Sequence, residues 1–147
     1  MENTNEMIIE FDSRSCNEGF ARVAVAAFAT QLNPTLEEVA DIKTAVSEAI
    51  TNSIIHGYEN EIHKIRIECK TQGHDLYVAV IDYGKGIEDV ARAMEPMFTT
   101  KPELERSGMG FAFMEAFMDE VAVASRPGEG TQVHMKKTIG ADRHPFE

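Results

Sequence analysis

The order in which the spacing of apolar residues changes along the chain constrains its fold more than any other feature. In residues 6–12, Met7, Ile9 and Phe11 alternate with Ile8 and Glu10, which is typical of a strand, and a helical spacing begins after residue 15. Alternation returns at residues 65–70, and residues 76–81 follow a turn at 72–75, so a hairpin is expected here. The remaining expected elements are a short helix at 88–94, an irregular stretch at 95–107, a helix at 110–118, and two strands at 120–125 and 131–138.

Two long helices are expected between the first strand and the hairpin. The first ends near Leu32, and the pair Thr35 and Glu38 forms a capping box that starts the second. Gly57 is expected to end that second helix. The apolar stripe of the first helix is expected to comprise Phe20, Val23, Ala24, Ala27 and Phe28, and that of the second Leu36, Val39, Ile42, Val46 and Ile50.

These elements predict an α/β two-layer sandwich (α+β), with a mixed, mostly antiparallel sheet and helices packed on one face. Residues 76–81 are apolar throughout, which places their strand at the centre of the sheet. No repeat and no stretch rich in Pro, Gly or Ser divides the chain. Residues 1–147 are therefore expected to form one domain.

The charge of the chain excludes several classes of protein. Among 147 residues, 14 Lys and Arg stand against 25 Asp and Glu, giving a net charge of −11. Such an acidic chain is not expected to contact nucleic acid directly, because phosphate backbones are bound by clustered cations. The longest apolar run, residues 23–29, is too short for a membrane span, and Cys16 and Cys69 are too few for a disulfide framework. A cytoplasmic protein without membrane contact is expected.

The first candidate cluster lies on the second helix. Glu48, Asn52 and His56 are four residues apart, which places them on one helix face. A solvated polar stripe would have the same spacing, but apolar residues flank these positions on nearly all sides. A buried carboxylate and amide need partners, and together they suit a general base and a magnesium ligand.

A second cluster, Asp82-Tyr-Gly-Lys-Gly86, directly follows the central strand. Its glycines, Gly84 and Gly86, could serve only the dihedral angles of a turn. Alternatively, the Asp82 carboxylate faces a cavity and accepts a hydrogen bond from an exocyclic amino group, while the two glycines let a flat ring approach.

A third cluster, Gly108-Met-Gly110-Phe, opens a helix, and helix N-termini bind anions. A flexible loop ending is the alternative. The preceding loop is cationic and rich in hydroxyls, which favours an anionic ligand in a chain this acidic. Thr131 opens the last strand and could reach the same cavity, although strand propensity alone explains a threonine there. The residues of the loop are Thr99, Thr100, Lys101, Arg106 and Ser107.

Together these motifs resemble the nucleotide-binding fold shared by gyrase, Hsp90, histidine kinases and MutL. They are a Glu/Asn helix, a D-x-G-x-G turn, a G-x-G-F helix start and a G-T-x-V strand, in that order. The phosphate-loop consensus G-x-x-x-x-G-K-[ST] and the protein-kinase motifs are absent from the sequence. A histidine-kinase-type ATP-binding fold is expected.

A narrower resemblance covers about residues 7–137. The runs PMFTTKPELERSGMGF at 96–111 and SEAITN at 47–52 resemble the anti-sigma F factors of spore-forming bacteria. This resemblance implies a homodimeric serine-protein kinase that sequesters a sporulation sigma factor. Using ATP, it would phosphorylate a serine of a small anti-anti-sigma protein.

The resemblance also implies roles for individual residues. Glu48 would be the general base, Asn52 the Mg²⁺ ligand, and Asp82 the partner of the adenine amino group. Tyr83 is a departure, since a smaller or acidic residue is more usual in this turn. Gly84 and Gly86 would make room for the ring, Thr131 would support the adenine contact, and Thr99, Lys101, Arg106, Gly108 and Gly110 would face the phosphates of ATP or ADP.

Three alternatives remain open at the level of sequence. One is the catalytic half of a histidine kinase, although no phosphoacceptor helix pair precedes the motifs. A second is a general-stress anti-sigma kinase, and a third is a non-catalytic nucleotide-gated binding protein. For any protein partner, the side of the first helix that bears Asn17, Glu18 and Arg22 is the expected contact, with Arg22 as its leading residue.

Overall fold

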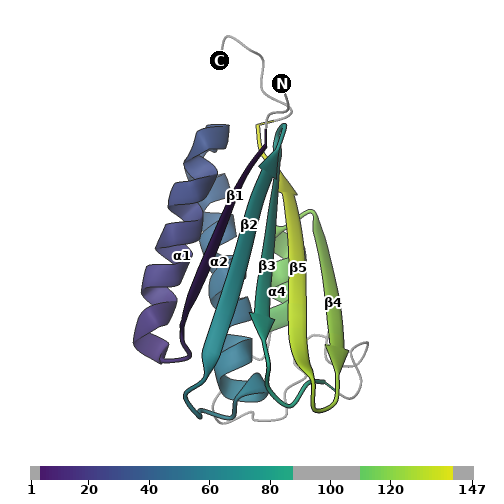
Figure 1. Ribbon diagram of the computed structural model, residues 1–147. Coiled ribbons are helices and arrows are strands. Elements are labelled where there is room, and N and C mark those ends of the chain that lie inside the picture. The colour runs from purple at the N-terminus through teal and green to yellow at the C-terminus, as the bar shows by residue number, and fades with distance from the viewer. Residues whose placement is uncertain (1–3, 88–109, 141–147) are drawn as a thin grey trace.

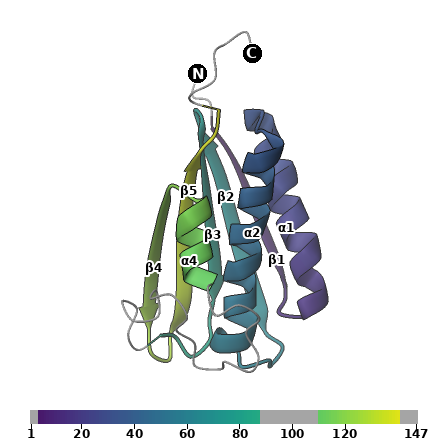
Figure 2. The ribbon, with the colours of Figure 1, turned by 180° about the vertical axis from the view of Figure 1, so that it is seen from behind.

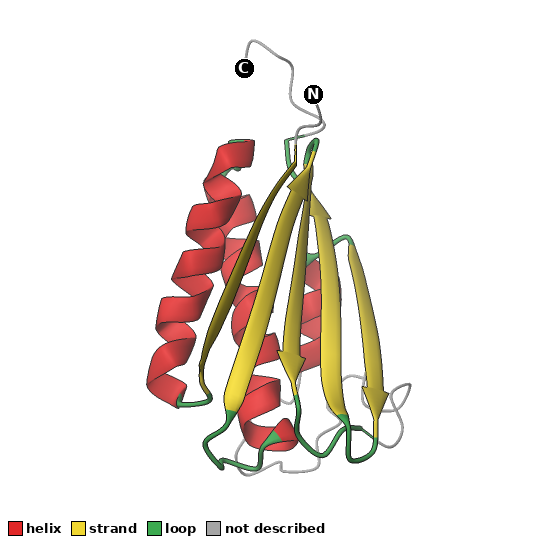
Figure 3. Ribbon diagram, viewed as in Figure 1, coloured by secondary structure: helices red, strands yellow, loops and turns green. Residues whose placement is uncertain are grey.

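The computed structural model describes residues 4–87 and 110–140, which form a sheet with helices against one face (Figures 1 and 3). This is the expected two-layer arrangement. The elements are β1 (Thr4–Asp12), α1 (Ser15–Ala29), a 3-10 turn (Thr30–Leu32), α2 (Leu36–Asn52), a π-helical turn (Ser53–Gly57), β2 (Lys64–Gln72), β3 (Asp75–Asp82), α4 (Gly110–Phe117), β4 (Glu120–Arg126) and β5 (Gly130–Thr138).

The five described strands lie in the order β1-β2-β3-β5-β4, so the expected central position of β3 is confirmed. All four pairings between them are antiparallel. The expectation of a mixed sheet is therefore wrong for the described strands. The alternation of side chains within a strand does not encode the direction of the neighbouring strands.

The start of α2 follows the sequence prediction. The Thr35 hydroxyl accepts a hydrogen bond from the Glu38 N–H at 3.0 Å, and the Glu38 carboxylate accepts one from the Thr35 N–H at 2.8 Å. This is the expected capping box. Of the predicted stripe, Ile42, Val46 and Ile50 are fully buried. Leu36, in contrast, is 90% exposed, because it lies in the first turn of the helix beyond the edge of the core.

The helix α1 has its expected place in the chain, but its buried face differs from the predicted one. Phe20 is 63% exposed and Val23 is 53% exposed. The buried residues of this helix are Ala21, Val25, Ala26 and Ala29. The segment is apolar around most of its circumference, so spacing alone does not select a face. The selected face carries mainly alanines, and these small side chains allow α1 to pack closely on its neighbours.

Seen from the helical side, α2 lies between α1 and α4 and covers the middle of the sheet (Figure 2). The core between the two layers is continuous and includes Ile42 and Ile50 of α2, Ile65 and Ile67 of β2, and Met114 of α4. This packing fixes the ends of α2 and β3 relative to each other, and these ends carry two of the three candidate clusters.

The short helix expected at 88–94 and the irregular stretch expected at 95–107 lie outside the described residues. Within the described ranges, none of the helices has the length and apolar character needed to cross a membrane.

Candidate functional site

Most predicted site residues that the structure describes lie at one end of the molecule. The end of α2, the end of β3, the start of β5 and the start of α4 all meet at the lower end in Figure 1. Asn52, Asp82, Gly110 and Thr131 belong to these four ends. The topology therefore brings together residues that are almost 80 positions apart in the sequence, as the sequence analysis expects.

Asp82 is the most unusual polar residue at this end. It ends the central strand and is 2% exposed. Its Oδ1 accepts a hydrogen bond from the Gly84 N–H at 3.0 Å, whereas its buried Oδ2 has no hydrogen-bond partner among the described residues. Buried polar atoms are nearly always paired, so an orphan acceptor of this kind indicates a donor supplied by a ligand. An exocyclic amino group fits that requirement.

The charge state of Asp82 reflects the same burial. Desolvation raises the pKa of this carboxyl above its usual value. The backbone N–H groups of Gly84 and Thr131 and the Ser53 hydroxyl oppose this shift by stabilising the charged form. Ser53, which is 1% exposed, was not among the predicted site residues. Its signal in the sequence is a small hydroxyl beside the apolar pair Ile54 and Ile55.

Gly57 has a role that the sequence analysis did not assign. A Cβ at this position would lie 2.9 Å from the carboxylate atoms of Asp82. Gly57 does end the helix, but it is not among the described glycines with positive φ. The glycine is therefore needed for the close approach of the π-helical turn to Asp82, and not for a left-handed helix end.

The two glycines of the D-x-G-x-G turn are also required by packing. A Cβ on Gly84 would overlap the carbonyl oxygen of Gly57, and one on Gly86 would overlap the carbonyl oxygen of Arg126. Gly86 also has a φ of 77°, which favours glycine. The turn is thus held between the end of α2 and the β4–β5 hairpin. That the two glycines also make room for a flat ring remains a prediction.

Thr131 lies opposite Asp82 in the β3–β5 register and is 3% exposed. Its Oγ1 is 2.9 Å from the Oγ of Ser125, which also accepts a hydrogen bond from the Ile87 N–H at 2.8 Å and donates one to the Gly130 carbonyl at 2.9 Å. Because the Ser125 proton is used on Gly130, the Thr131 hydroxyl donates to Ser125 and keeps its own lone pairs for another donor. Ser125, at the end of the strand predicted at 120–125, was not among the predicted site residues.

Glu48 and Asn52 lie one turn apart on the last part of α2, and both are partly buried. Across the described residues, no group of three His, Cys, Asp or Glu side chains is placed to hold a metal ion. A magnesium ion at Asn52 would therefore depend on the oxygens of a phosphate ligand, which is the usual mode for this ion. His56 lies in the π-helical turn, where the wider spacing breaks the four-residue register with Asn52.

Of the remaining predicted residues, the structure describes Gly110 and Arg22. Gly110 is the first residue of α4, as expected. Thr99, Lys101, Arg106 and Gly108 lie outside the described residues. On α1, Arg22 forms an ion pair with Glu18 at 3.0 Å, and Glu18 in turn accepts a hydrogen bond from the Ser47 hydroxyl on α2.

The close contact at Gly57 leads to a testable expectation. In a Gly57→Ala variant, the added methyl group should displace the Asp82 carboxylate, because that side chain is easier to move than the backbone of the turn. We expect the variant to remain folded, with unfolding free energy lowered by about 1–3 kcal/mol, while a ligand that contacts Asp82 binds at least about tenfold more weakly. Thermal unfolding and nucleotide titration measure the two effects. Gly19→Ala, at an open position of α1 where a Cβ meets nothing within 4 Å and φ is not positive, is the control for unfolding, and unchanged ligand affinity in Gly57→Ala would contradict the assigned contact.

The two-layer fold is consistent with a match to a known class of domain, the histidine kinase-like ATPase domain. A family model with that description matches residues 13–137. Among curated relatives, the anti-sigma F factor of Thermoanaerobacter sp. (strain X514) is 60% identical over 143 residues, which are 97% of this chain and 100% of the relative. That of Oceanobacillus iheyensis is 56% identical over 140 residues, covering 95% of this chain and 96% of the relative. The chain belongs to the anti-sigma F factor family.

Two solved structures share the fold at low sequence identity. The RsbU and RsbW domains of a Mycobacterium tuberculosis protein superpose with a TM-score of 0.66 at 19% identity, covering 92% of this chain and 32% of that one. The histidine kinase domain of the blue-light activated kinase EL346 from Erythrobacter litoralis has a TM-score of 0.56 at 18% identity, covering 86% of this chain and 61% of that one. At this identity the likeness concerns the fold alone.

Proposed function

We propose that the protein binds and inhibits a sporulation sigma factor and, using ATP and Mg²⁺, phosphorylates a serine of its anti-anti-sigma antagonist. The products are ADP and phosphoserine. Membership of the anti-sigma F factor family supports the sigma-factor partner, and the ATPase-type domain supports the use of a nucleotide. We further propose that the protein acts in the cytoplasm as a homodimer.

The observation that carries this proposal is the orphan Oδ2 of Asp82. A buried acceptor that has no partner within residues 4–87 and 110–140 fits a ligand with a donor at that point, and the 6-amino group of adenine is such a donor. Gly84 and Gly86 border the same turn, and the Thr131 hydroxyl lies on the neighbouring strand. A guanine or hypoxanthine base has a carbonyl at this position and leaves the acceptor unpaired.

The proposed mechanism assigns one task to each residue. Glu48 accepts the proton of the attacking serine hydroxyl, and Asn52 supplies an amide oxygen to the metal. Mg²⁺, when bound, neutralises phosphate charge and orients the transferring group. Lys101 and Arg106 add positive charge to the phosphates, Thr99, Gly108 and Gly110 contribute hydroxyl or backbone donors, and phosphoryl transfer itself then depends mainly on positioning.

Arg22 is the proposed contact for protein partners. Its side chain is 41% exposed, and Glu18, its ion-pair partner, is 15% exposed. Because Glu18 also receives the Ser47 hydroxyl, the charge at this surface is connected to the helix that carries Glu48. A partner with an acidic group could bind Arg22 by replacing Glu18.

Incubation with γ-labelled ATP and the candidate antagonist tests the proposed activity. Label should move to the antagonist and survive acid, as phosphoserine does and phosphohistidine does not. Nucleotide binding without transfer of label would leave the second candidate, a nucleotide-gated binding protein, which the site geometry equally permits. Acid-labile label would contradict the serine assignment.

A further inference from the structure

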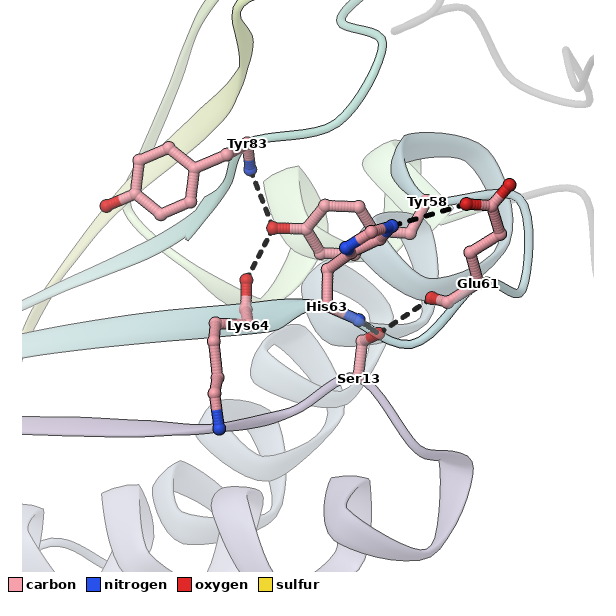
Figure 4. Close-up of polar contacts among 6 residues, drawn as sticks. All are labelled: Ser13, Tyr58, Glu61, His63, Lys64 and Tyr83. Carbon is pink, nitrogen blue, oxygen red and sulfur yellow. Dashed lines mark hydrogen bonds and ion pairs between the residues drawn. The ribbon is translucent and has the colours of Figure 1, made fainter.

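Tyr58 directly follows Gly57 and holds the turn that carries Asp82. Although tyrosines commonly reach solvent, Tyr58 is 6% exposed. Its hydroxyl accepts a hydrogen bond from the Tyr83 N–H at 2.8 Å and donates one to the carbonyl oxygen of Lys64 (Figure 4). A single side-chain group thus joins the residue after Asp82 to the first residue of β2.

A second hydrogen bond, to the residue before Tyr58, also holds this turn. The Lys85 N–H donates to the Gly57 carbonyl at 3.0 Å, two residues further along the turn. The intervening Gly84 N–H donates to Asp82 itself. Three successive amides of the turn therefore have fixed acceptors, and the middle one determines which carboxylate oxygen of Asp82 is used within the protein. Oδ2 has no hydrogen-bond partner among the described residues.

Tyr58 can hold the turn because it is itself held. Its ring contacts the His63 ring, with centroids 4.9 Å apart. The His63 backbone is fixed to the turn between β1 and α1, since its N–H donates to Ser13 Oγ at 2.9 Å and its carbonyl accepts from the Ser13 N–H at 2.8 Å. Ser13 Oγ also donates to the Glu61 carbonyl at 3.0 Å. Figure 4 shows the His63 ring beside the Tyr58 ring and Ser13 bonded to the backbone of His63 and Glu61.

Packing alone does not require the hydroxyl, because a phenylalanine ring would fill the same space against His63. A buried hydroxyl costs free energy unless it is paired, and both of its partners here are backbone groups of separate segments. We propose that Tyr58 is a positioning residue for purine recognition, whose hydroxyl fixes the 82–85 turn so that Oδ2 of Asp82 faces the amino group of adenine. This inference rests on the proposed nucleotide site and adds a residue that does not itself touch the ligand.

The substitution Tyr58→Phe tests this role by removing only the hydroxyl. An open cavity of about 570 Å³ borders Tyr58 and Tyr83, so water can reach the freed backbone groups and moderate the effect. We expect ATP and ADP to bind about 5- to 20-fold more weakly. We also expect the preference for ATP over ITP, which has a carbonyl in place of the 6-amino group, to fall at least about fivefold. The matched control is Tyr77→Phe, because Tyr77 lies on the far face of β3 beneath Lys136.

The ATP-to-ITP ratio separates positioning from stability. A residue that only stabilises the fold would weaken both nucleotides equally, and an unchanged ratio in Tyr58→Phe would overturn the inference while the proposed nucleotide site stands. Failure of the wild-type protein to bind ATP would instead refute the proposed function. Should Tyr58→Phe not fold, amide exchange of Tyr83 in the wild-type protein decides: slow exchange without nucleotide supports the bond to Tyr58, and exchange at the rate of an unprotected amide contradicts it.

Discussion

Replacing Glu48 with alanine should lower the rate of phosphoryl transfer by about 10²- to 10⁴-fold, the usual contribution of a general base. The binding of ADP should change little, because the proton that Glu48 accepts belongs to the protein substrate and not to the nucleotide. Single-turnover transfer of label to the antagonist measures the first effect, and calorimetric titration with ADP and magnesium measures the second. Glu48→Gln should behave in the same way, since an amide keeps the size of the side chain but cannot take the proton.

Glu37→Ala provides the control for this experiment. Glu37 lies on the same helix, in its first turn, and is exposed at the end opposite to the site. This variant should retain the wild-type transfer rate. Full activity in Glu48→Ala would remove Glu48 from the role of base, and loss of ADP binding would show that it acts on the nucleotide or on the fold instead.

The second large effect is expected at Asp82. In Asp82→Asn, one oxygen can still accept the Gly84 N–H, but an amide NH₂ replaces the orphan Oδ2 and opposes the amino group of adenine. Hydrogen bonds to charged groups contribute about 1.5–3 kcal/mol, so ATP affinity should fall about 10- to 150-fold. ITP should lose much less or gain affinity, because its carbonyl accepts from the new NH₂. Equal losses for ATP and ITP in parallel titrations would contradict the assignment.

The raised pKa of Asp82 adds a dependence on pH. As pH falls through this pKa, the carboxylate is protonated and ATP affinity should decrease, starting at a higher pH than for an ordinary aspartate with a value of 3.8. As pH falls, the unfolding free energy of the ligand-free protein should instead increase. The folded state binds the Asp82 proton more tightly than the unfolded state, so this group lowers stability as pH rises from 3.8 to the raised pKa. Asp82→Asn should remove both contributions.

The elements of this fold could be predicted because each has a local signal. The Thr35 and Glu38 pair starts α2 by hydrogen bonds within four residues, and the unbroken apolar run of β3 favours the central position that this strand has in the sheet. The ends of these elements carry Asn52 and Asp82, so their meeting at one end of the molecule followed from the topology.

Other features depend on contacts between distant segments, which spacing does not encode. Nothing in the sequence of α1 distinguishes the exposed Phe20 from the buried Val25, since both lie on apolar stripes and the choice is made by packing. The contact between Gly57 and Asp82 and the bond between the Tyr83 N–H and the Tyr58 hydroxyl likewise join residues about 25 positions apart. These contacts position Asp82 and the turn that follows it. The local sequence at Gly57 predicted only a helix end.

Calorimetric titration of the wild-type protein with ATP and ITP, each with magnesium, tests the central claim most directly. The buried acceptor at Asp82 predicts a single binding event per chain with ATP and an affinity about 10- to 150-fold lower for ITP, the cost of losing one charged hydrogen bond. The absence of binding heat with ATP, or equal affinities for the two nucleotides, would contradict it.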